Sequence, residues 1–325
     1  MEAFIKLFKD ISYKDLSKVG GKNASLGEMY NQLNPEGIRV PDGYATTSDA
    51  YWYFLEQNNL KEQLTGILDS LDTDDFHNLP KVGKQARELI LNAGFPDEIR
   101  HEIEKGYTYL KSEYGDDISL AVRSSATAED LPTASFAGQL ETYLNVSGLN
   151  NLFKACHHSY ASLFTDRAIK YRVDNGFEHM QVALSVGVQT MVRSDKACSG
   201  VLFTLDPDTG FENVVVISGS WGLGENIVQG AVNTDEFVVF KPLLDKAEQP
   251  VISRKIGSKA KTMIYAEKSD SELQSPADAT LNLDTPAAQQ EQFVLADGEV
   301  VQLAKWGKRI EEHYKQPMDI EWAKD

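Results

Sequence analysis

The sequence is poor in cysteine, in basic residues and in long apolar runs. Its 325 residues include two cysteines, too few for a disulfide framework or a cysteine zinc site. Lys and Arg number 32 against 49 Asp and Glu, a net charge of -17, which argues against a nucleic-acid-binding surface. No apolar run is long enough to span a bilayer, and the charged first residues do not form a secretory signal. These deficits predict a cytoplasmic protein in a reducing compartment, with neither nucleic acid nor membrane as partner.

The content that remains is typical of a folded protein with one large or two medium domains, since 42% of the residues are hydrophobic and 25% are charged. Helical periodicity dominates the first half, and β-type runs dominate the second. The predicted elements are a helix through 51–57 capped from 47–49, short amphipathic helices over 60–113 with a break at 92–96, one helix over 149–174, strands at 181–192, 199–205, 213–218 and 236–240, a polar surface loop at 267–284, a helix at 297–314 and a last strand at 317–322.

The stretch 121–146 is the centre of the functional argument. An apolar run leads into Arg123, which is followed by small hydroxyl residues, by Gly138 and by a second β-type run at 142–146. This order predicts a strand, a flexible lid whose N–H groups and hydroxyls face an anion, and a returning strand. Arg123 supplies a planar cationic fork that suits phosphate oxygens. A Ser/Thr-rich turn with a surface arginine is the alternative interpretation of the same residues.

A second candidate phosphate contact is Lys22. Two glycines precede it, and residues 24–29 are expected to open a helix, so the lysine would lie at a helix start that a phosphate can approach. The motif is not a P-loop, because the required earlier glycine is absent and Asn23 stands where Ser or Thr is needed. Taken alone, the stretch favours a helix N-terminus with a solvated lysine.

Two other motifs have weaker meaning. The glycine-rich stretch 218–226 is not a dinucleotide fingerprint, because Ile227 occupies the place of the third glycine, and it is either a phosphate-facing or a tight structural turn. The run Cys156-His157-His158 does not form a metal site in a helix, because consecutive helical residues point in different directions.

The last predicted strand carries two carboxylates. Alternation along a strand places Asp319 and Glu321 on one face and the apolar residues between them on the other. Magnesium prefers oxygen ligands and bridges phosphates, so the pair is a candidate Mg²⁺ site. An exposed acidic face is the alternative. A lysine, an arginine, a lid and an acidic strand together suit a nucleotide held between two lobes, and such positioning with charge stabilisation is what phosphoryl transfer requires.

With these motifs in view, the chain resembles, over essentially its whole length, the N-terminal nucleotide-binding domain of the phosphoenolpyruvate synthases (pyruvate, water dikinases). Pyruvate phosphate dikinases and rifamycin phosphotransferases share much of this domain. The motifs that carry the resemblance are VGGKNASLGEM, AVRSSATAEDLPTASFAGQ, VGVQTMVRSD, SGVLFTLDPDTGF, WGLGENIVQGAVNTDEF and HYKQPMDIEWAKD.

The resemblance implies an α+β, ATP-grasp nucleotide-binding fold of two lobes, with mixed or antiparallel sheets and flanking helices. Residues 1–188 would form the N-terminal lobe with the lid, and residues 189–325 the C-terminal lobe with the adenine-pocket and metal-binding strands. The implied ligands are ATP and Mg²⁺. The implied roles are phosphate contact for Lys22 and Arg123, the lid for Gly138 and Thr142, the adenine pocket for Gln189, Met191 and Val192, and magnesium binding for Glu321 with Asp319.

The implied reaction has two stages. ATP phosphorylates a histidine, leaving AMP and phosphate, and the phosphohistidine then phosphorylates pyruvate to phosphoenolpyruvate. The histidine belongs to a swivelling domain and pyruvate to a C-terminal barrel, and none of the six histidines here lies in a motif of that kind. The resemblance also implies a further strand with a Gln-x-Arg-Pro element after residue 325. We therefore expect the N-terminal part of a longer enzyme, for which a homodimer is one possible state.

Two alternatives stay open at this point. One is a stand-alone module that senses adenylates without catalysis. The other is a related dikinase-type phosphotransferase whose acceptor is phosphate, a rifamycin antibiotic or a glucan, because acceptor choice would lie outside this chain.

Overall fold

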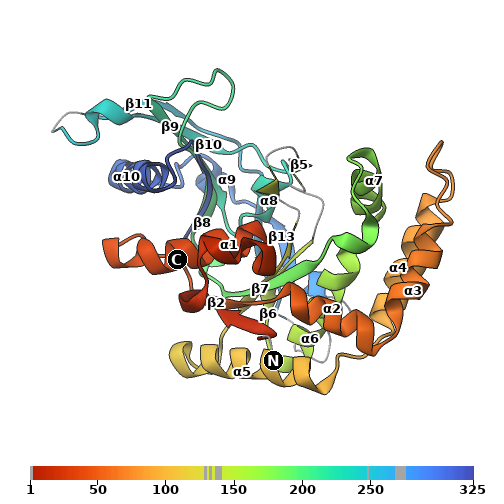
Figure 1. Ribbon diagram of the computed structural model, residues 1–325. Coiled ribbons are helices and arrows are strands. Elements are labelled where there is room, and N and C mark those ends of the chain that lie inside the picture. The colour runs from red at the N-terminus through yellow and green to blue at the C-terminus, as the bar shows by residue number, and fades with distance from the viewer. Residues whose placement is uncertain (1–2, 128–129, 132–133, 136–140, 247–248, 268–275) are drawn as a thin grey trace. The chain divides into compact units, whose positions relative to one another are not determined.

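The computed structural model describes residues 3–127, 130–131, 134–135, 141–246, 249–267 and 276–325. The chain forms two compact units: Met1–Met191 with Lys268–Ala279, and Val192–Glu267 with Thr280–Asp325. Each unit holds a five-stranded sheet with helices packed against it (Figure 1). The protein is therefore α+β with antiparallel sheets, as predicted. Among the described residues, no helix combines the length and the apolar character needed to cross a bilayer.

The sheet of the first unit has two unlike faces. Its strand order is β1-β2-β7-β3-β6, and every pairing is antiparallel. Large residues such as Tyr44, Val122 and Val188 point into the main core, whereas the opposite face carries small residues such as Ala45 and Gly187. The small face lets a helix approach the sheet closely. The strands are β1 (Ile5–Leu7), β2 (Gly43–Thr46), β3 (Leu120–Ala126), β6 (Thr142–Val146) and β7 (Leu184–Thr190), with a short pair of β4 (Asp130–Leu131) and β5 (Ala134–Ser135) between β3 and β6.

The helices of the first unit follow the predicted pattern except near residue 24 and within residues 149–174. Thr47 caps α2 as expected, because its hydroxyl accepts from the Ala50 N–H. The predicted single helix over 149–174 is wrong, since the chain leaves α6 at Leu163 and Thr165 caps a new helix, α7. The Thr165 hydroxyl accepts a hydrogen bond from the Ala168 N–H at 3.3 Å. That N–H is then not available to continue α6, and a second helix starts instead. The helices are α1 (Leu16–Gln32), α2 (Ser48–Gln57), α3 (Leu60–Leu68), α4 (Leu79–Leu91), α5 (Asp97–Tyr114), α6 (Leu149–Ser162) and α7 (Asp166–Asp174).

The second unit is built on the sheet β11-β10-β9-β8-β14, again antiparallel throughout. Helix α10 lies where the sequence predicted a helix, covers one face and buries Val300, Ala304 and Ile310. The predicted loop over 267–284 is wrong at its end, because Thr280–Asp284 forms a strand that pairs with β12. The elements are β8 (Cys198–Phe203), β9 (Val214–Trp221), α8 (Glu225–Val228), β10 (Asp235–Phe240), β11 (Val251–Lys255), β12 (Lys261–Tyr265), β13 (Thr280–Asp284), α9 (Ala287–Gln290), α10 (Asp297–Tyr314) and β14 (Asp319–Lys324).

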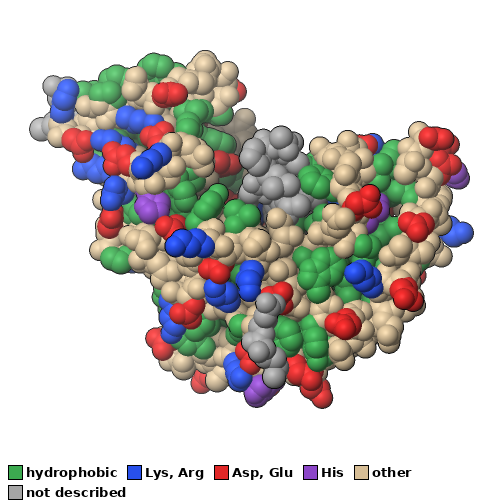
Figure 2. All heavy atoms as spheres, in the orientation of Figure 1, with side chains coloured by type: hydrophobic (Ala, Val, Ile, Leu, Met, Phe, Trp, Pro, Cys, Tyr) green, Lys and Arg blue, Asp and Glu red, His purple; other side chains and the backbone are tan. Residues whose placement is uncertain are grey.

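Basic side chains of the second unit are engaged in ion pairs. Figure 2 shows Lys and Arg interspersed with Asp and Glu over β11 and α10. Arg254 makes two hydrogen bonds to Asp297, at 2.9 and 2.6 Å. Lys259 is fully buried and bonds Asp235 at 2.5 Å, and Asp235 also accepts the Gly257 N–H. Lys259 thus has an internal structural role, and Arg254 links β11 to α10.

Candidate functional site

Helix α1 carries Lys22 and is broken just before it. Gly20 has φ 73° and ψ 165°, a backbone conformation open almost only to glycine. A Cβ at this position would overlap the Ser125 hydroxyl of β3. The helix resumes after the break, so Lys22 lies in the first turn of its second segment and is exposed. The expected helix start near residue 24 is therefore corrected to Leu16, with the break at Gly20.

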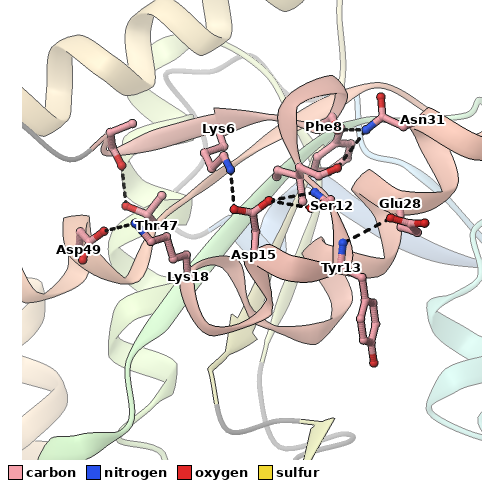
Figure 3. A network of polar contacts seen from close by, with 12 residues as sticks. Lys6, Phe8, Ser12, Tyr13, Asp15, Lys18, Glu28, Asn31, Thr47 and Asp49 are labelled. Atoms are coloured by element: carbon pink, nitrogen blue, oxygen red, sulfur yellow. Dashed lines mark hydrogen bonds and ion pairs between the residues drawn. The ribbon is translucent and has the colours of Figure 1, made fainter.

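Polar contacts fasten both ends of α1 (Figure 3). Before the helix, Asp15 accepts from the Ser12 N–H at 3.0 Å and from Lys6 at 2.6 Å. At the far end, the Asn31 amide donates to the carbonyls of Phe8 and Ile11, at 3.0 and 2.9 Å. The helix is thereby held to the segment that leads into it.

The middle of α1 is fastened by Asn23, whose side chain is 1% exposed. Its amide donates to the Val19 carbonyl at 3.1 Å and to the Ser185 hydroxyl of β7 at 2.9 Å. A Cβ at Gly187 would overlap the Asn23 Oδ1, so glycine there makes room for the amide. Sequence reasoning noted Asn23 only as the residue that excludes a P-loop and missed this role. The small residues of the GGKNAS stretch were the available signal.

Arg123 lies within strand β3. It is directly opposite Thr142 on β6 and Gly187 on β7. Opposed residues in an antiparallel pair share a face, so Arg123 and Thr142 project from the same side of the sheet as the Asn23 contact. Both are partly buried. Arg123, Thr142 and the α1 segment that bears Lys22 therefore lie on one face of one sheet.

The hydroxyls next to Arg123 do not line the lid as the sequence suggested. Ser124 and Ser125 are buried within β3. Ser124 donates to the Glu141 carbonyl at 3.1 Å and lies 3.2 Å from the Ser162 hydroxyl of α6, so it faces the core side. Thr127 bonds the Ala183 carbonyl. Strand alternation turns Ser124 to the face opposite Arg123, whereas Ser125 lies on the same face as Arg123 and is covered there by Gly20 of α1. Gly138 lies outside the described residues.

The predicted adenine-pocket residues lie at the end of β7 and just beyond it. Gln189 is opposite Ala121, on the same face as Arg123, and its amide donates to the Pro41 carbonyl at 3.0 Å. The Met191 sulfur accepts from the Asn145 N–H at 3.0 Å, and the Met191 N–H donates to the Ser119 carbonyl at 2.9 Å. Val192 is partly buried and begins the second unit. Gln189 and Met191 are thus fixed by local hydrogen bonds.

Asp319 and Glu321 lie on β14 of the second unit. Both are exposed, while Ile320 and Trp322 between and beyond them pack against the core. Trp322 lies over glycines of β8 and β9, where a Cβ at Gly200 would be 2.5 Å from the ring. The predicted alternation is confirmed. Two carboxylates on one strand face are hard oxygen donors, which fits Mg²⁺.

The only group of three metal-ligating side chains within reach of one another, among the described ranges, is Asp72, Asp75 and His77. It lies on the surface of the first unit, between α3 and α4. The side-chain hydrogen bond between His77 and Asp75 raises the pKa of His77. The predicted pair Asp319 and Glu321 thus has no third such ligand among the described residues.

The chain belongs to the family of pyruvate phosphate dikinase AMP/ATP-binding domains, whose sequence model matches residues 16–325. Among curated proteins it is similar to phosphoenolpyruvate synthases. That of Neisseria meningitidis serogroup B is 51% identical over 324 residues, which are 99% of this chain and 40% of the relative.

The synthases of Helicobacter pylori and Escherichia coli are each 48% identical, over 99% and 98% of this chain and 40% and 39% of their own lengths. The resemblance predicted from the motifs is confirmed. The chain spans about 40% of the length of these relatives.

Proposed function

We propose that this chain is the ATP-binding, phosphoryl-donating part of a phosphoenolpyruvate synthase, which converts pyruvate, ATP and water to phosphoenolpyruvate, AMP and phosphate. The observation that carries the proposal is the common sheet face of Arg123, Thr142 and the Lys22 segment, in a chain of this family. A cationic fork, an ammonium and a hydroxyl from three separate elements suit a polyphosphate.

In this proposal the two cations divide the phosphate charge. Arg123 comes from the rigid centre of a sheet and can orient phosphate oxygens through paired N–H groups. Lys22 comes from the first turn of a helix segment, where backbone N–H groups and the helix dipole also favour an anion. Thr142 offers its hydroxyl from the strand opposite. Gly138 would complete this part of the site from the lid.

The adenine base of ATP would be held at the end of β7. The Gln189 amide is already engaged with Pro41, so it presents a fixed surface instead of a mobile side chain. Met191 and Val192 add apolar contact. A preordered pocket of this kind lowers the entropy cost of binding a nucleotide.

Magnesium is the cofactor that the carboxylates of β14 fit. Asp319 and Glu321 would hold it, and the ion would neutralise charge on the transferring phosphates. The proposal includes the two-lobe ATP-grasp organisation, with lobes 1–188 and 189–325 that both contribute to one Mg-ATP. The compact units divide after Met191, and residues 268–279 belong to the first.

The histidine that receives the phosphoryl group and the pyruvate site would belong to the remaining length that the relatives have. We place the enzyme in the cytoplasm as part of the same proposal. The two cysteines, Cys156 and Cys198, are buried thiols, which a reducing compartment preserves.

Calorimetric titration with Mg-ATP tests the proposal, on this chain and on the natural gene product in parallel. We expect saturable binding that prefers Mg-ATP to Mg-GTP. Arg123→Ala should lower the affinity by about a hundredfold, because a charge-assisted bidentate contact is worth about 3 kcal/mol. Arg167→Ala, an exposed arginine of α7, is the matched control and should bind as the wild type does.

Thermal unfolding without ligand separates binding from folding. Arg123→Ala should unfold within a few degrees of the wild type. A collapse of thermal stability would make Arg123 a structural residue, and binding that ignores the substitution would contradict its phosphate role.

A further inference from the structure

We propose that Asn23 and Ser185 form a buried lock that positions Lys22 for phosphate binding. This inference rests on the proposed role of Lys22 in that site. Asn23 is a positioning residue in this account, because its amide bonds protein groups inside the unit and not the ligand. In a P-loop, the residue after the lysine would offer a hydroxyl to magnesium. Here the residue after the lysine is directed into the sheet.

The first step of the argument is the local weakness of α1. The break at Gly20 interrupts helical geometry directly before Lys22. The residues that follow the break could therefore shift as a loop unless other contacts hold them. The Asn23 amide bridges the break by donating to the Val19 carbonyl on its far side, at 3.1 Å.

The second step is the link from this break to the central strands. The same amide donates to the Ser185 hydroxyl at 2.9 Å, and that hydroxyl donates to the Thr46 carbonyl of β2 at 2.5 Å. The Thr46 hydroxyl in turn accepts from the Val186 N–H at 2.9 Å. Asn23, Thr46 and Ser185 are all at most 1% exposed. The chain of bonds fixes the backbone of residue 23 to both β2 and β7.

The third step joins this lock to Arg123. Ser185 is opposite Ser125 in the β3–β7 pair, and Ser125 is the residue that Gly20 touches. Arg123 lies two residues along β3 on the same face. The lock therefore sets the position of the Lys22 backbone in the frame of the strand that carries Arg123. Displacement of a binding group by about 1 Å can cost up to about a hundredfold in function.

Asn31 provides a matched control within the same helix. It is also an asparagine whose amide donates to main-chain carbonyls, those of Phe8, Ile11 and Gly27. Its contacts anchor the far end of α1 and do not reach β3 or β7. A purely structural role for asparagine in α1 predicts equal consequences at positions 23 and 31.

The experiment measures the Kd for Mg-ATP by calorimetry at a temperature where every variant is folded. We expect Asn23→Ala and Ser185→Ala each to weaken binding by about tenfold, and Asn31→Ala to bind as the wild type does even though it unfolds at a lower temperature. Ser185→Ala is the smaller change and serves if Asn23→Ala fails to fold. In a Lys22→Ala background, Asn23→Ala and Ser185→Ala should have no further effect, because the lock acts through Lys22.

The outcomes separate this inference from the proposed function. If Lys22→Ala weakens binding while Asn23→Ala and Ser185→Ala do not, the positioning role is wrong and the phosphate site stands. Additive losses in the Lys22→Ala background would equally overturn it. Wild-type protein that does not bind Mg-ATP, or binding indifferent to Lys22→Ala, would overturn the proposed function and this inference with it.

Discussion

At the residue scale, His157 shows how packing decides protonation. Its ring stacks on Phe95 with centroids 4.0 Å apart and planes 4° from parallel. Burial, with smaller contributions from His158 and Arg100, lowers the pKa of His157 to about 4 from its ordinary 6.5. The folded state therefore holds a neutral imidazole at pH values where the unfolded chain takes up a proton.

This difference predicts a pH dependence of stability. The pKa of His157 is lower in the folded state than in the unfolded state. Its contribution to the free energy of unfolding is therefore fully present above pH 6.5 and is lost as the pH falls from there toward 4. Denaturant unfolding between pH 8 and pH 4.5 should show a decline that is shallower in His157→Phe than in the wild type. Parallel curves for the two proteins would mean that His157 does not contribute to acid sensitivity.

At the scale of elements, the break in α1 is a specific part of the folded structure and not the fraying of a helix end. Gly20 combines a positive φ with direct contact to Ser125 on β3. Gly37, which follows the same helix, has φ 88°, but a Cβ added there would meet nothing within 4 Å. Alanine at Gly37 would therefore meet only the strain of a left-handed backbone, whereas alanine at Gly20 would meet a more strained backbone conformation and overlap with Ser125.

Alanine substitutions at Gly37 and Gly20 should therefore lower the free energy of unfolding by different amounts. Gly37→Ala introduces only backbone strain, about 1 kcal/mol in the free energy of unfolding. Gly20→Ala adds overlap with a buried strand, and we expect about 3 kcal/mol or more. Urea denaturation of both variants measures the difference. Equal losses would show that Ser125 yields easily and that the break tolerates a side chain.

Particular elements show the reach of sequence reasoning. The α10 periodicity, the Thr47 cap and the β14 alternation were predicted because each depends on neighbours in sequence. The join between α6 and α7 was missed because a single capping threonine decided it against a continuous apolar pattern. Strand β13 was missed because its residues are mostly exposed and only pairing with β12 makes them a strand.

At the scale of the whole molecule, the residues predicted to bind ATP and Mg²⁺ are distributed over both compact units. Lys22, Arg123 and Thr142 belong to the first, and Asp319 and Glu321 to the second. If both units bind one Mg-ATP, as proposed, then a substitution in the second unit should change how ATP binding depends on Mg²⁺ without changing the binding of ATP in the absence of the metal.

Glu321→Gln tests that separation. We expect it to weaken ATP binding about tenfold in the presence of Mg²⁺, from the loss of about 1.4 kcal/mol of charge interaction, and to have little effect in EDTA. Calorimetry with and without Mg²⁺ provides the comparison, with Glu312→Gln on the exposed side of α10 as the control. Equal losses with and without Mg²⁺ would contradict a metal role for Glu321.

The sequence by itself determined the family, the helix and strand patterns and the candidate residues Lys22, Arg123, Gln189 and Glu321, because motifs and periodicity are local properties of a chain. Only the tertiary structure decided which of these share a face. It placed Arg123 inside a strand and opposite Thr142, turned Ser124 toward the core, and joined Asn23 to Ser185 and Lys259 to Asp235. The physical reason is that buried polar groups must find partners, and those partners come from strands and loops that only folding brings together.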